Sequence, residues 1–82
     1  MISTLIGDVD RFASFLAENG FVDESKALFE CHQIAGTGLE LHLLLRQELR
    51  RILGEREIPS ISRYHAERLE ERLTEAIGPG TF

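Results

Sequence analysis

The residues best able to do chemistry in this sequence are one cysteine, Cys31, and three histidines, His32, His42 and His65. Thiolate and imidazole groups are the ligands that zinc prefers in proteins. Cys31 and His32 are adjacent, so on a helix their side chains point about 100° apart and cannot chelate one ion together. The sequence has no Cys-x-x-Cys pair and no two histidines at the i,i+4 spacing of helical zinc ligands. We therefore predict no metal site.

Catalysis is not expected from Cys31 or from the carboxylates. A cysteine nucleophile needs an exposed setting that lowers its pKa, whereas Cys31 falls on the apolar face of a predicted helix. The acidic pairs along the chain fall on polar helical faces, where their expected role is solubility. Gly36-Thr37-Gly38 follows no predicted strand, which a dinucleotide-binding glycine loop requires. The sequence predicts no enzyme and no cofactor.

Four helices are expected to position these residues. Apolar residues recur at helical spacing over about 3–18, 24–35, 38–53 and 61–77, and no segment alternates with the period of a strand. Each predicted helix starts at a side chain that can cap it and stops at a glycine. The expected caps are Ser3 or Thr4, Asp23, Thr37 together with Glu40, and Ser60 or Ser62, and the expected stops are Asn19-Gly20, Gly36, Gly54 and Gly78.

Short connections between these helices favour antiparallel neighbours. The sequence therefore predicts an all-α fold, a small antiparallel four-helix bundle built from two helical hairpins. Its 82 residues suit one domain over 1–82, with 78–82 as a flexible tail. In this bundle Ile34 and Ala76 are expected in the core, and His42 and His65 are expected as hydrogen-bonded residues in or beside it.

The net charge of −5 is unevenly distributed along the chain. Residues 1–41 hold seven acidic and two basic residues, whereas 42–82 hold seven arginines and seven glutamates. An acidic first half repels nucleic acid and anionic membranes and suits a basic protein partner. No apolar run approaches the roughly 20 residues of a membrane span, and the start of the chain lacks the plan of a signal peptide. We expect a cytoplasmic protein with no membrane partner.

The clearest functional signal is a set of apolar side chains outside the apolar stripes. Phe15, Phe29 and Leu44 lie off the main apolar face of their predicted helices, and Tyr64 projects outward one turn before Arg68. Aromatic side chains beside arginine are typical of protein interfaces. Arg46 and Arg50 are expected either at the rim of such a surface or paired with the N-terminal acids. The predicted interface residues are Phe15, Phe29, Leu44, Tyr64, Arg46 and Arg50.

These features predict a non-catalytic protein–protein interaction module. It either self-associates, for example as a homodimer, or binds a basic protein, as immunity and antitoxin proteins do by analogy of size and charge. The alternative is a helix-turn-helix nucleic-acid-binding regulator, because a short glycine turn joins the second and third helices and Arg46, Arg50 and Arg51 could contact phosphates. Nucleic acid is not the expected partner, since the third helix is mostly leucine and the chain is acidic.

Overall fold

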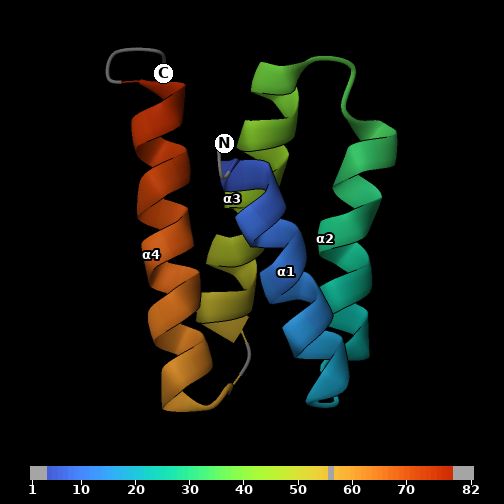
Figure 1. The fold of residues 1–82 in the computed structure, drawn as a ribbon, viewed down its shortest axis with the longest axis vertical. Helices are drawn as coiled ribbons and strands as arrows, with labels where there is room; N and C mark the ends of the chain where they lie inside the picture. The colour runs from blue at the N-terminus through green and yellow to red at the C-terminus, as the bar shows by residue number, and fades with distance from the viewer. Residues whose placement is uncertain (1–3, 56, 79–82) are drawn as a thin grey trace.

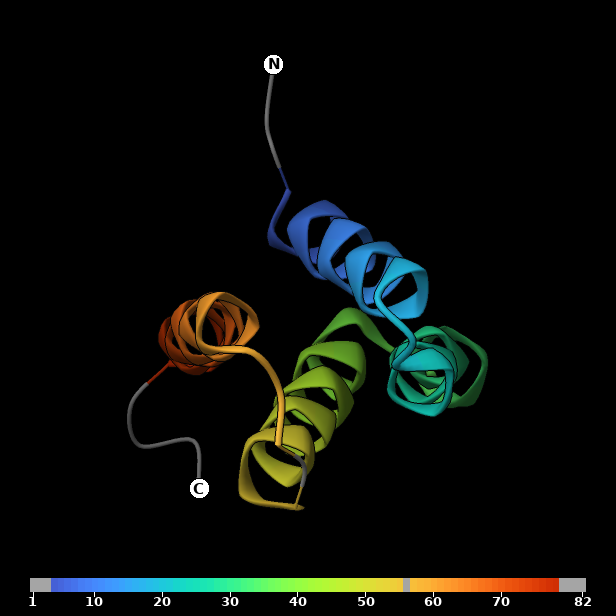
Figure 2. The same cartoon turned by 90° about the horizontal axis from the view of Figure 1, so that it is seen from below.

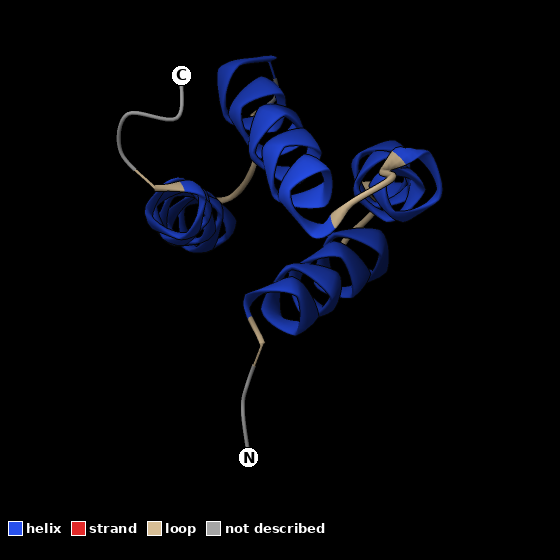
Figure 3. Cartoon of the chain, turned by 90° about the horizontal axis from the view of Figure 1, so that it is seen from above, coloured by secondary structure: helices blue, strands red, loops and turns tan. Residues whose placement is uncertain are grey.

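The computed structural model describes residues 4–55 and 57–78, which form four α-helices and, within those ranges, no strand (Figures 1 and 3). The helices are α1 (Leu5–Glu18), α2 (Val22–Ile34), α3 (Gly38–Glu55) and α4 (Ser60–Ile77). Consecutive helices run antiparallel, each packs against the next, and α1 also packs against α4 (Figure 2). This ring of helices confirms the predicted antiparallel four-helix bundle.

The start and end of α1 follow from two local signals. Thr4 Oγ1 accepts a hydrogen bond from the amide of Gly7 at 2.9 Å, which confirms Thr4 as the N-cap. Gly20 has a φ of 91°, a left-handed conformation that glycine adopts without a Cβ clash. The amide of Phe21 then donates to the carbonyl of Leu16 at 2.8 Å and turns the chain into α2. Ser3, the alternative cap, lies outside the described residues.

The predicted cap of α2 is wrong. The helix begins at Val22, so Asp23 lies inside its first turn, and the residue at the cap position is Phe21, whose side chain makes no capping hydrogen bond. Phe21 instead packs, partly buried, against the core. Hydrophobic anchoring of the turn therefore sets where α2 starts, in place of a polar cap.

The third and fourth helices begin in different ways. At α3, Thr37 Oγ1 accepts from the amide of Glu40 at 3.1 Å as predicted, while the Glu40 carboxylate accepts from the amide of Gly36. At α4, neither Ser60 nor Ser62 is the cap, because the helix starts at Ser60 after Pro59 and Ser62 is buried. Proline fixes φ near its helical value, here −54°, so it leads into the helix without a side-chain hydrogen bond.

The core lies on the axis of the bundle and receives side chains from all four helices. Its buried apolar residues are Val9, Phe12, Ala13, Leu16, Leu28, Cys31, Leu45, Leu49, Ile52, Ile58, Ala66, Leu69, Leu73 and Ile77. Two predicted core residues, Ile34 and Ala76, are exposed. α2 is rotated so that Glu24 and Ser25 are buried, which turns Ile34 outward. Ile58, in the loop before α4, takes a core position that periodicity could not predict. The predicted tail residues 79–82 lie outside the described residues.

Candidate functional site

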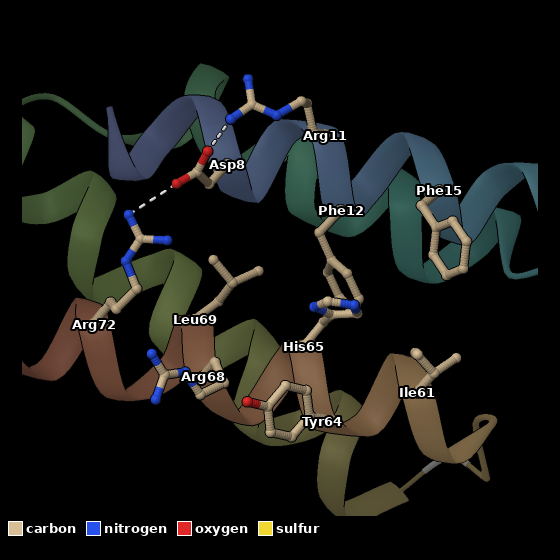
Figure 4. Close-up of a pocket in the computed structure, with 10 residues that line it drawn as sticks. All are labelled: Asp8, Arg11, Phe12, Phe15, Ile61, Tyr64, His65, Arg68, Leu69 and Arg72. Carbon is tan, nitrogen blue, oxygen red and sulfur yellow. Dashed lines mark hydrogen bonds and ion pairs between the residues drawn. The ribbon is translucent and has the colours of Figure 1, made fainter. Parts of the chain in front are cut away.

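A surface groove of about 750 Å³ lies between α1 and α4 (Figure 4). Both helices contribute side chains at intervals of three or four residues, so each wall is a single helical face beside the core stripe. The α1 wall comprises Asp8, Arg11, Phe12 and Phe15, and the α4 wall comprises Ile61, Tyr64, His65, Arg68, Leu69 and Arg72. Phe12 and Leu69 are also core residues, so the floor of the groove is continuous with the core.

One end of the groove is closed by ion pairs. The Asp8 carboxylate pairs with Arg11 on its own helix and, at 2.8 Å, with the guanidinium of Arg72 on α4 (Figure 4). The side chain of Asp8 is only 20% exposed, so this pair is partly shielded from water. Asp8 therefore ties the first helix to the last at this end.

The other end is open and aromatic. Phe15, Ile61 and Tyr64 remain 38%, 63% and 59% exposed although they line the same hollow. The ring of Tyr64 meets the ring of His65 edge-on, with centroids 5.8 Å apart, while the rings of His65 and Phe12 point toward each other from opposite walls (Figure 4). Clustered exposed apolar side chains, unlike scattered ones, mark interaction sites.

The electrostatics of the groove differ from those of the chain. Among the described residues that line it, three arginines, Arg11, Arg68 and Arg72, face one acid, Asp8, whereas the chain carries −5. Arg11 and Arg72 share that acid, and Arg68 has no ion-pair partner among the described residues. The groove is thus a locally positive surface with an apolar floor.

The structure brings together two of the predicted interface residues, Phe15 and Tyr64, and separates the others. Phe29 is 40% exposed but belongs to α2 and does not line the groove. Leu44, predicted to project outward, is instead partly buried against the core.

Arg46 and Arg50 face α4. The Nε of Arg50 donates to Glu70 Oε2 at 2.7 Å, and the Arg46 guanidinium lies 3.5 Å from Thr74 Oγ1. Of the two expected settings, pairing with the N-terminal acids is therefore not the one that Arg50 adopts. Periodicity could not reveal this, because the identity of the neighbouring helix depends on how the hairpins assemble.

The residues first considered for chemistry lie apart from one another. His32 Nε2 is 2.9 Å from Asp10 Oδ1 on α1, and His42 Nδ1 is 2.6 Å from the carbonyl of Gly38. His42 is half-buried, and His65, expected in or beside the core, is exposed in the groove. Across residues 4–55 and 57–78 there is no cluster of three potential metal-ligating side chains.

Cys31 is buried, and its thiol donates to the carbonyl of Ala27 at 3.4 Å. Burial, followed by the negative charge of Glu48, raises the pKa of the Cys31 thiol above its ordinary value of 9.0. Cys31 therefore stays protonated near neutral pH, which is the opposite of what a nucleophile requires.

None of the four described helices combines the length and apolar content needed to cross a membrane. Comparison with protein-family models, curated proteins and solved structures finds no match to this chain. Its function must therefore be inferred from its own residues, and the groove between α1 and α4 is the candidate binding site.

Proposed function

We propose that this chain is a non-catalytic protein-interaction module and that the α1–α4 groove is its binding surface. The observation that carries the proposal is the exposure of Phe15, Ile61 and Tyr64 around one hollow flanked by arginines. A buried aromatic centre with arginine beside it is the composition of energetically dominant interface residues. An exposed cluster of this kind gains free energy when a partner removes it from water.

A basic partner has less support than the uneven charge of the sequence implies. Several acids of the first half interact within the molecule: Asp8 with Arg72, Asp10 with His32, and Glu40 with the turn before α3. Glu24 is buried in the bundle. The exposed acids of this half without such a contact among the described residues are Glu18, Asp23 and Glu30, which are fewer than the seven in the sequence.

The helix-turn-helix alternative also lacks a supporting observation. Its three phosphate-contacting candidates already interact with protein groups, since Arg50 pairs with Glu70, Arg51 pairs with Glu48 at 2.8 Å, and Arg46 lies against Thr74. Contact with a phosphate backbone would require these partners to be exchanged.

Capture of binding proteins by matched variants tests the proposal. Immobilised wild-type chain, Tyr64→Ser and Phe29→Ser are exposed to lysate of the source cells, and the retained proteins are compared by quantitative mass spectrometry. Tyr64 and Phe29 are both exposed aromatics, but only Tyr64 lines the groove. We expect Tyr64→Ser to lose a specific partner that Phe29→Ser keeps. Loss of that partner from Phe29→Ser alone would place the binding surface on α2 and contradict the proposal.

A further inference from the structure

The charge of the groove indicates which kind of protein segment binds there. This inference rests on the proposed function. We infer that the partner presents an amphipathic helix whose apolar face is flanked by carboxylates. Its apolar residues would contact Phe15, Ile61 and Tyr64, and its acids would meet Arg11, Arg68 and Arg72.

The shape of the site favours a helix. The groove runs between two helices, and the ridge of a third helix packs into such a channel. The described residues include no strand, so they offer no sheet edge to an extended peptide. The longer wall runs along α4 from Ile61 to Arg72, which is roughly 18 Å of helix and enough for about three turns of a bound helix.

The charge of the site favours carboxylates. Arg11 is 70% exposed at the closed end, although it pairs with Asp8, and Arg68 lies exposed beside Tyr64 with no ion-pair partner among the described residues (Figure 4). Asp8 is the only acid among the described residues that line the groove, and it already pairs with two arginines. An acidic helix adds charge-assisted hydrogen bonds here, whereas a basic helix meets three like charges.

The same charges disfavour two other occupants. In a two-fold dimer that joins groove to groove, both surfaces would carry the same excess of arginines. Single-stranded nucleic acid also combines with aromatic and arginine side chains, but it carries a charge on every nucleotide. The −5 chain therefore repels it more strongly than a helix whose acids lie only on its flanks.

A pair of synthetic helices provides the test. Both have about 14 residues, matching α1 in length, and the same leucine and phenylalanine face, and they differ only in carrying glutamate or lysine on its flanks. Neither contains tyrosine or tryptophan. Because Tyr64 is the one tyrosine in the chain and tryptophan is absent, its fluorescence reports binding at the groove. Each helix is titrated into the full chain at low and at high salt.

We expect the glutamate helix to bind roughly tenfold more tightly than the lysine helix at low salt, since each exposed ion pair contributes up to about fivefold and three arginines take part. Salt should reduce this preference. Arg68→Glu should weaken binding of the glutamate helix about fivefold. Lys26→Glu on α2 changes the net charge by the same amount outside the groove and should change binding less than about twofold.

Three results would overturn the inference. Equal binding of the two helices, or a preference for lysine, refutes an acidic partner but leaves the groove as a protein-binding surface. Failure of both helices to alter Tyr64 emission refutes a helical occupant, and lysate capture then judges the proposed function separately. Tighter binding of a single-stranded oligonucleotide than of the glutamate helix would replace the protein partner with nucleic acid.

Discussion

Phe12 and Phe15 provide a direct test of the groove, because they lie one turn apart on α1 and differ mainly in burial. Phe12 is 6% exposed and Phe15 is 38% exposed. An enclosed phenylalanine buries about 200 Å², so the two residues differ by roughly 65 Å² of buried area. At about 25 cal/mol per Å², this area corresponds to about 1.6 kcal/mol of stability.

Truncation to alanine should reveal this difference. Phe12→Ala also leaves a cavity in the core, so we expect it to lower the free energy of unfolding by about 3–4 kcal/mol. Phe15→Ala opens onto solvent, leaves no enclosed cavity and should cost about 1.5–2 kcal/mol. The change in helix propensity is the same at both positions and cancels in the comparison.

Urea unfolding followed by circular dichroism measures both values. With a slope of about 1 kcal/mol per molar urea, the two midpoints should differ by about 1.5–2 M. A domain of 82 residues has roughly 4–12 kcal/mol of stability, so a Phe→Leu pair is the substitute if Phe12→Ala is unfolded. Equal losses at the two positions would show that Phe15 is a core residue, and the groove would then lack its open aromatic end.

Three other perturbations follow from single contacts. Thr4→Ala removes the side-chain cap of α1 and should lower stability by about 1 kcal/mol in urea unfolding, with an unchanged slope. Asp8→Asn frees Arg72 and should cost about 1 kcal/mol at low salt and less at high salt, because the Asp8 pair is partly exposed. The pKa of the Cys31 thiol is raised in the folded state, so the folded chain holds this proton more strongly than the unfolded chain. This contribution to stability is complete below about pH 9 and is lost as pH rises through the folded pKa, which alkaline unfolding of wild type against Cys31→Ala would detect.

The sequence predicts the helices well where one local interaction decides the outcome. Thr4 can reach only the amides of its own first turn, and Gly20 suits a left-handed turn wherever it occurs. The predicted start of α2 and the predicted burial of Ile34 were wrong, because both depend on how the whole helix is rotated about its axis. In the observed rotation Glu24 and Ser25 are buried. A periodic pattern of apolar residues cannot predict which polar residues enter the core.

The candidate site was predicted only in part for a similar reason. Phe15 and Tyr64 stand out from the apolar stripes of their helices, and the structure places both in the groove. The residue pattern within either helix cannot predict that α1 and α4 are neighbours. Ile61 and Arg72 were therefore missed, although their spacing from Tyr64 and Arg68 on α4 was the available signal.

The pairing of α1 with α4 also has a consequence for biosynthesis. The two walls of the groove come from opposite ends of the described chain. The closed end can form only after Arg72 has been synthesised, because Asp8 pairs with it. During synthesis, the α1–α2 hairpin can associate early, whereas this long-range contact requires closure of the whole intervening chain. In a nascent chain that has not reached residue 72, Phe12 and Phe15 of α1 are therefore exposed without the complete α4 wall opposite them. The proposed binding surface is therefore complete only at the last step of assembly, so binding there would require a fully folded chain.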